Sequence, residues 1–204
     1  MEAKALPMRK LDPRRMLEAI QFSEQLCDPH LWLRKADELL AAARVLENEI
    51  KAQWTEIVVE DRHIVRTSGR IAVHAPYFLL VAYAVENFFK GLLVHRHRDE
   101  LRGRLLPSLP KYLNEHDLIT LAKRVGFTTA LADQDLLTRL SRNSIWAGRY
   151  PVPTGPDGSR ALKQYMDGRV YLIAVFYPND VDRLHELLDR LRAYVVAELA
   201  EGAA

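Results

Sequence analysis

The chain contains a single cysteine, Cys27, so it can form no internal disulfide bond. A lone cysteine is typical of proteins that fold in a reducing compartment, and nothing near Cys27 favours a thiolate nucleophile. Charge of one sign is also scarce, because the net charge is only +2 at pH 7. A strong basic excess, the usual mark of a protein that coats nucleic acid, is therefore absent.

Long apolar runs are missing as well. The longest one, Tyr77 to Val85, falls well short of the roughly 20 apolar residues that a helix needs to cross a bilayer. Met1 to Arg15 include basic residues but no apolar stretch typical of a signal peptide. We therefore predict a cytoplasmic protein with no membrane contact.

Several patterns that carry chemistry are not found in the sequence. There is no glycine-rich phosphate loop, no serine nucleophile elbow and no cysteine–histidine metal pattern. His95 and His97 are two positions apart, so on a helix they point about 200° away from each other and cannot share a metal ion. We predict neither a metal nor a cofactor.

Helical patterns cover most of the chain, which is 49% hydrophobic and 27% charged. Asp28 followed by Pro29 predicts the start of one helix, and apolar residues then recur every three or four positions as far as Ile50. We predict further helices over about 11–25, 76–98 and 117–125, one capped by Thr128 or Thr129, and one that starts near Asn179. The apolar stripe of the last helix packs on the bundle or, alternatively, pairs with a second subunit, and we favour packing on the bundle.

Three segments interrupt the helical pattern. Residues 55–68 favour a loop with a short β-hairpin, residues 151–158 form a loop rich in proline and glycine, and residues 169–177 favour extended structure. We predict an all-α protein with a helical N-terminal extension over 1–27 and one helical domain over 28–200.

Three segments stand out within this pattern. They are Ala82 to Leu93, which contains Glu86 and Lys90, then His116-Asp117-Leu118, and the run Arg142-Asn143-Ser144-Ile145-Trp146-Ala147-Gly148-Arg149-Tyr150-Pro151. In content and in order along the chain they resemble the HEPN family, small helical domains found in RNA-cutting toxins and in partners of nucleotidyltransferases. The resemblance implies a helical bundle, a homodimer in which both copies line one cleft, and a prokaryotic defence or toxin–antitoxin context.

The same resemblance assigns roles to the motif. HEPN ribonucleases carry an arginine, often followed by asparagine, and a histidine a few residues further on; the histidine moves the proton of an RNA 2′-hydroxyl and the arginine stabilises the phosphate, without a metal. Arg142 and Asn143 match the start of this motif, but Ala147, Gly148 and Arg149 occupy the positions where the histidine is expected. Arginine stays protonated and Tyr150, with an ordinary pKa near 10, is a poor base.

We therefore predict that Arg142, Asn143, Arg149 and Tyr150 bind a phosphate of RNA or of a nucleotide without cutting it. An asparagine near a helix end is also ordinary capping chemistry, so Asn143 has a structural alternative. Two other functions stay open: a metal-independent ribonuclease in which His116 or His74 replaces the missing base, and a docking partner of a nucleotidyltransferase that uses the final helix as its interface.

Glu86 and Lys90 leave two interpretations open. Glutamate four positions before lysine is the favourable order for an ion pair within a helix, which is the simpler interpretation. The alternative is that one of them faces the same cleft as Arg142. Asp117 is predicted to cap the next helix, which would leave His116 at the rim of that cleft.

Overall fold

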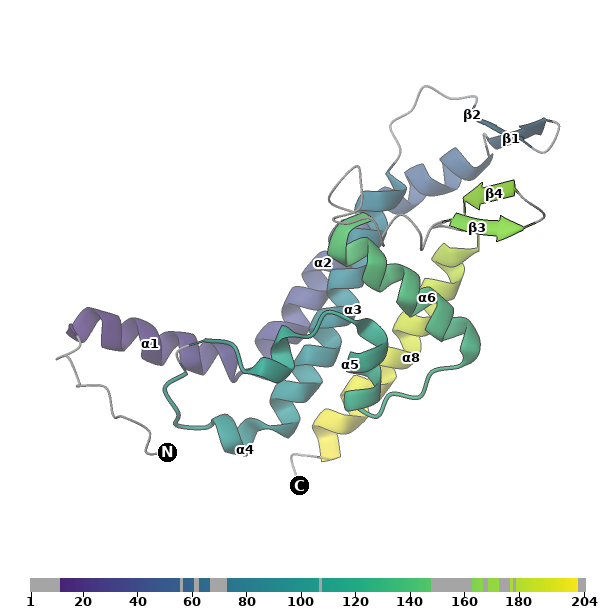
Figure 1. Cartoon of the computed structure of the whole chain (residues 1–204). Helices are drawn as coiled ribbons and strands as arrows, with labels where there is room; N and C mark the ends of the chain where they lie inside the picture. Colours follow the sequence, from purple (N-terminus) through teal and green to yellow (C-terminus); the bar gives the residue numbers. More distant parts are fainter. Residues whose placement is uncertain are drawn as a thin grey trace.

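The computed structural model describes residues 12–55, 57–60, 63–66, 73–106, 108–147, 163–166, 169–172, 177 and 179–201. This part of the chain is mostly helical, which confirms the all-α class (Figure 1). The helices are α1 (Pro13–Leu26), α2 (Pro29–Thr55), α3 (His74–Arg96), α4 (Arg98–Leu101), α5 (Leu118–Arg124), α6 (Leu131–Arg142) and α8 (Asp180–Glu201), with a 3₁₀ turn η1 (Lys111–Asn114) and a π-helical turn η2 (Asn143–Ala147).

Helix α3 is the core of the bundle. It packs along α2 and is covered by α5, α6 and α8, as Figure 1 shows. By length and composition it is the one helix in the described ranges that could cross a membrane, but 78% of its apolar window is buried in the bundle. It is therefore a core helix, and the apolar run at its start serves packing.

Local capping explains where the helices begin and end. The side chain of Asp28 accepts a hydrogen bond of 2.9 Å from the backbone N–H of His30, and that of Asp117 accepts one of 2.7 Å from Thr120. Helix α5 ends before Gly126, whose φ of +67° lies in the left-handed region. These three boundaries confirm the sequence-based prediction.

The predicted cap of α6 was wrong. Neither Thr128 nor Thr129 caps this helix, because Ala130 occupies the N-cap position. The carboxylate of Asp133 takes over by accepting a bond of 2.8 Å from the backbone N–H of Ala130. Threonine before an apolar stripe is a common N-cap pattern. In α6, however, a carboxylate inside the first turn satisfies the backbone N–H group instead.

Two small antiparallel hairpins extend from the helices. Strands β1 (Ile57–Glu60) and β2 (His63–Arg66) confirm the predicted hairpin in the 55–68 segment. Strand β4 (Arg169–Leu172) confirms extended structure after residue 168 and pairs with β3 (Lys163–Met166). The predicted loop over residues 151–158 lies outside the described residues.

The apolar stripe of α8 faces the core, as predicted. Its members from the first turn to the fifth are almost fully buried: Val181, Leu184, Leu188, Leu191 and Val195. The stripe of α6 is buried in the same way at Leu136, Leu137 and Leu140. Neither helix therefore keeps its main apolar face for another molecule.

Candidate functional site

Glu86, Lys90 and His116 form one polar cluster beside the core. Lys90 Nζ donates a hydrogen bond of 2.7 Å to Glu86 Oε1 within α3, and His116 Nδ1 lies 3.1 Å from the same oxygen. The cluster joins α3 to the residue that precedes the cap of α5. Sequence spacing predicted the ion pair, and the structure adds the histidine to it.

Burial differs sharply among these three residues. The side chains of Lys90 and Glu86 are 5% and 10% exposed, whereas that of His116 is 60% exposed. A buried lysine and a buried glutamate stabilise each other's charge, since neither ion is tolerated alone out of water. The burial favours the structural ion pair, and His116 is the member of the cluster that meets solvent.

The carboxylate also orients the imidazole of His116. A carboxylate accepts only, so Nδ1 of His116 carries the hydrogen and Nε2 is the nitrogen left to face solvent. Histidines held in this way by a carboxylate serve as general bases and as phosphate ligands. The exposed Nε2 is thus the reactive atom that this cluster presents.

The end of α6 is tied to two other helices by neighbouring residues. Ser141 Oγ accepts a bond of 2.9 Å from the backbone N–H of Leu118, at the start of α5. Asn143 Nδ2 donates a bond of 3.2 Å to the carbonyl of Ala75, at the start of α3. Asn143 is fully buried, so the structure gives it a role in joining helices.

Arg142 lies between these two ties. It is half-buried, and within the ranges that the structure describes its guanidinium makes no hydrogen bond or ion pair. Other arginines near the same helix are paired: Arg139 with Asp180, Arg183 with Asp180, and Arg190 with Asp133. An arginine that stays without an anion at a helix junction is suited to bind one from outside.

The backbone changes at the same place. From Asn143 to Ala147 the helix widens into a π-helical turn. Such turns are rare in proteins, and those that occur are often found at functional sites. Gly148, Arg149 and Tyr150 lie outside the described residues, so the predicted roles of Arg149 and Tyr150 stay predictions.

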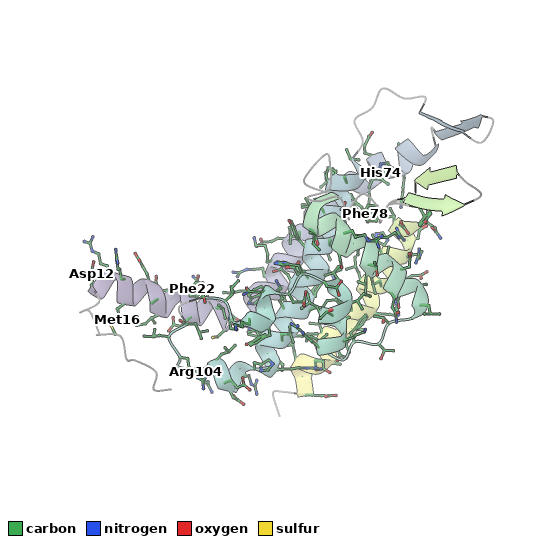
Figure 2. The ribbon with its side chains drawn as sticks, in the orientation of Figure 1. Asp12, Met16, Phe22, His74, Phe78 and Arg104 are labelled. Atoms are coloured by element: carbon green, nitrogen blue, oxygen red, sulfur yellow. The ribbon has the colours of Figure 1, made fainter. Side chains whose placement is uncertain are left out.

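The predicted site residues fall at two levels of α3. His116 meets the helix at Glu86, whereas His74 is the first residue of α3, next to Ala75 and therefore close to the Asn143 tie. His74 and Glu86 are about 18 Å apart along the helix at a rise of about 1.5 Å per residue. Figure 2 shows His74 and Phe78 at the end of α3 that is remote from α1.

His116 and Arg142 lie in two segments that are joined by a hydrogen bond between their neighbours. The Ser141–Leu118 hydrogen bond joins the two segments, since Ser141 precedes Arg142 and Leu118 follows His116 by two positions. The structure therefore brings the second and third motif segments of the sequence together. The Glu86–Lys90 pair contacts the second of these segments through His116.

A second polar cluster was not anticipated from the sequence. Tyr77 on α3 donates a hydrogen bond of 3.2 Å to Glu47 Oε1 on α2, and Nε2 of His185 on α8 contacts the same oxygen. Burial, reinforced by the Glu47 carboxylate, raises the pKa of Tyr77 far above its ordinary value. The group sits in a cleft of about 150 Å³.

The charges that line this cleft favour neither an anionic nor a cationic ligand. Arg44 and Arg192 line it together with two carboxylates, Glu47 and Asp189. Cations and anions are thus balanced, and the three-helix hydrogen bonding is sufficient to explain the cluster as packing. Glu47 and His185 are 138 positions apart, so no local pattern could have paired them.

Comparison with known proteins adds no relative. The chain matches no family model, no curated protein and no solved structure.

Proposed function

We propose that this chain is a HEPN-like module that binds a phosphate group of RNA or of a nucleotide at the face formed by Arg142 and His116. The observation that carries the proposal is the unpaired, half-buried guanidinium of Arg142, noted above for the described part of the chain. Arginine binds phosphate through two parallel N–H donors, which gives both affinity and orientation. A prokaryotic defence or toxin–antitoxin context and a homodimer are parts of the same proposal.

The neighbouring residues have supporting roles in this proposal. Ser141 and Asn143 hold the helix end to α5 and α3, so Arg142 is presented from a fixed backbone. Arg149 and Tyr150 follow in sequence and add a second cation and a hydroxyl donor. The histidine that would take a proton is missing from the motif, so binding occurs without cleavage.

One observation favours a second function, a metal-independent ribonuclease in which His116 is the base. Its Nδ1 is bound to Glu86, so its exposed Nε2 can accept the proton of a 2′-hydroxyl. The 2′-oxygen then forms a bond to phosphorus, and the bond from phosphorus to the 5′-oxygen breaks. The products are a 2′,3′-cyclic phosphate and a 5′-hydroxyl once that leaving oxygen takes up a proton.

Binding is tested by fluorescence anisotropy with a short single-stranded RNA and with a labelled mononucleotide. Arg142→Ala is expected to weaken binding at least about tenfold, equal to about 1.4 kcal/mol, and to reduce the salt dependence by about one phosphate contact. Arg34→Ala, at an exposed arginine of α2, is the matched control and should bind like the wild type. Unchanged binding by Arg142→Ala would contradict the proposal.

Cleavage is tested on total RNA with and without a chelator, using wild type, Arg142→Ala and His116→Gln side by side. Binding without any cleavage supports the leading proposal. Cleavage by the wild type alone, with 2′,3′-cyclic phosphate ends, supports the second function. Activity that disappears when only the chelator is added contradicts it, because its chemistry needs no metal.

Docking to a nucleotidyltransferase receives less support from the fold. The final helix was predicted as that interface, and the apolar stripe of this helix, α8, is buried inside the bundle. Co-purification with a nucleotidyltransferase encoded by a neighbouring gene is the direct test. A complex that survives His116→Gln and Arg142→Ala would establish docking as a function separate from phosphate binding.

A further inference from the structure

A pocket of about 630 Å³ lies at the C-terminal end of α3. Figure 1 shows α4 and the last turns of α8 at this end of the bundle, and Figure 2 labels Arg104 here and His74 at the other end. Ala75, which Asn143 contacts, and His95, which lines the pocket, are about 30 Å apart along α3 at a rise of about 1.5 Å per residue. The pocket is therefore separate from the site of Arg142.

Segments that are distant in the chain build this pocket. It is formed where the junction of α1 and α2 meets the end of α3, α4 and the end of α8. We call it the basic pocket, and its walls include Cys27, His30, His95, Arg98, Arg102 and Leu199.

Contacts between helices hold the walls of the basic pocket in place. Cys27 Sγ donates a hydrogen bond of 3.9 Å to the carbonyl of Leu101, which ties the junction of α1 and α2 to α4. Arg96 Nε donates one of 3.0 Å to Glu198 Oε2, which ties the end of α3 to α8. The shape of the pocket thus follows from the packing of the bundle.

The charged side chains of the basic pocket are mainly cationic. Two arginines, Arg98 and Arg102, and two histidines, His30 and His95, line it. Asp99 is the one carboxylate among the described residues that line it, and its side chain is 88% exposed. The lining therefore carries a net positive charge that increases when the histidines are protonated.

Neighbouring carboxylates are engaged with other groups. Asp28 caps α2 by accepting a hydrogen bond from the backbone N–H of His30, and Glu100 lies 3.3 Å from Nδ1 of His97. Glu198 is paired with Arg96. Across the ranges given for this structure, the guanidinium of Arg102 makes no hydrogen bond or ion pair. The pocket thus offers a cation that no carboxylate of the chain neutralises.

A metal ion is the alternative ligand, because cysteine and histidine are the residues that bind zinc. Nowhere in the described part of the chain do three or more metal-binding side chains form a group that could hold a metal ion. Burial raises the pKa of the Cys27 thiol, whereas zinc is bound by the thiolate. The charges of Arg98 and Arg102 would also repel a cation, so the lining favours an anion.

From these observations we infer that the basic pocket binds a small organic phosphate, with Arg98, Arg102 and the two histidines as donors to the phosphate group. A phosphate monoester carries about −1.5 to −2 charges at pH 7 and three acceptor oxygens, which suits several cationic donors. The volume lies within the range of about 300–1,000 Å³ that is typical of small-molecule sites. Leu199 and Pro29 offer apolar surface to the organic part. This second site goes beyond the proposed function and does not depend on it.

His95 gives the basic pocket a pH dependence. Burial lowers the pKa of His95 below its ordinary value of 6.5, and the charges of Arg98 on α4 and His30 on α2 lower it further. The backbone and the charge of Glu198 on α8 oppose these effects but do not outweigh them. A bound anion favours the protonated imidazole, so by reciprocity protonation strengthens anion binding. Affinity for an anion of constant charge should therefore rise as the pH falls through the pKa of His95.

Isothermal titration calorimetry with AMP tests the inference in the full chain carrying Arg142→Ala, so that the site of Arg142 does not contribute. This protein is expected to bind AMP, and to bind adenosine, which lacks the phosphate, at least about tenfold more weakly. Adding Arg102→Ala should weaken AMP binding at least about tenfold, through loss of a charge-assisted hydrogen bond. Arg104→Ala is the matched control, because Arg104 is also exposed but does not line the pocket.

Histidine NMR signals give a second readout that is local to the basic pocket. The signal of His95, assigned with His95→Gln, is followed through a pH titration with and without sulfate. Sulfate should raise the pKa of His95 in the wild type and leave it unchanged in Arg102→Ala.

Three results of the calorimetry would overturn the inference. They are the absence of AMP binding, equal affinity for AMP and adenosine, and AMP binding that Arg102→Ala leaves unchanged. Tighter binding of a short single-stranded RNA than of AMP by the Arg142→Ala protein would also overturn it, because the pocket would then serve an RNA backbone. Circular dichroism must be the same for all variants, which separates loss of binding from loss of the fold.

Discussion

Asp180 and Arg139 form the most deeply buried ion pair that the structure describes. Asp180 is fully buried, and Arg139 reaches it with two nitrogens while also donating a bond of 3.0 Å to Asp135. Burial alone would lower the pKa of Arg139, but its hydrogen bonds to the two carboxylates outweigh burial and raise the pKa. The pair joins the end of α6 to the start of α8.

Asp180→Asn should therefore destabilise the protein strongly. It leaves the Arg139 cation buried without its main counter-charge, and loss of one partner of a buried pair typically costs about 3–5 kcal/mol. The free energy of unfolding in urea measures the effect. Asp37→Asn is the control, because Asp37 pairs with Arg192 on the surface and should lose less than about 1 kcal/mol.

Sequence patterns predicted pairs that are close in the chain and missed those that are distant. The Glu86–Lys90 pair followed from one turn of helix geometry. Its contact with His116, 30 positions away, and the Arg139–Asp180 pair, 41 positions apart, depend on how helices pack. A sequence holds many carboxylates and arginines, and only the packed bundle decides which of them meet.

At the scale of single elements, two glycines with positive φ test how much the backbone conformation after a helix contributes to stability. Gly126 ends α5 with φ of +67°, and Gly103 follows α4 with φ of +72°. Replacing either by alanine should cost about 1–2 kcal/mol, because an L side chain is strained in this region. A Cβ at Gly126 would also lie 3.4 Å from the Tyr194 hydroxyl, whereas one at Gly103 meets no atom within 4 Å.

The comparison of the two glycines separates strain from packing. Thermal unfolding should show a similar loss of stability for Gly103→Ala and Gly126→Ala. Any additional loss of stability at Gly126 would be due to the contact with Tyr194. A loss at Gly126 alone would mean that the contact, and not the backbone conformation, sets the cost.

The start of α6 is coupled to α8 through Asp133. This carboxylate accepts bonds of 2.6 and 3.1 Å from Arg190 and one of 2.8 Å from the backbone N–H of Ala130. Burial raises the pKa of Asp133, but these hydrogen bonds outweigh burial and hold the pKa below 3.8. Because the folded state lowers this pKa, the carboxylate stabilises the fold above pH 3.8, and that contribution is lost as pH falls through the lowered value.

Asp133→Asn should accordingly be less stable than the wild type at neutral pH. The gap in free energy of unfolding between the two proteins should stay constant down to about pH 4 and then narrow as the wild-type carboxylate takes up a proton. Urea unfolding at a series of pH values measures it. A gap that widens in acid would show that Asp133 is not stabilised in its charged form.

The start or end of a helix could be predicted from the sequence where a single residue determines it. Asp28, Asp117 and Gly126 act on neighbouring backbone groups, so their effect shows in the sequence. The start of α6 was missed because Asp133 serves the backbone and Arg190 at once. The preference of Asp133 for the first turn of a helix can be seen in the local sequence, but its hydrogen bonds to Arg190 of α8 cannot.

At the scale of the whole molecule, α1 either contributes to the stability of the bundle or extends from it as a separable arm. The sequence predicted an N-terminal extension over 1–27, and among the residues that the structure describes α1 is anchored near its end, through Ser23 and Leu26. Trp32 Nε1 also donates a bond of 3.1 Å to the carbonyl of Leu26. The anchor and the exposed arm are thus different parts of one helix.

A chain that begins at Ser23 should keep the bundle, because it retains the bonds to Leu106 and Trp32, and the large apolar side chains of α1 that it removes are exposed. We expect cooperative thermal unfolding and wild-type affinity for RNA. A chain that begins at Pro29 also loses the buried Leu26 side chain, which contributes about 1.5–3 kcal/mol, and should unfold at a lower temperature. If the chain from Ser23 already unfolds without cooperativity, the outer turns of α1 are part of the core and the extension is not separable.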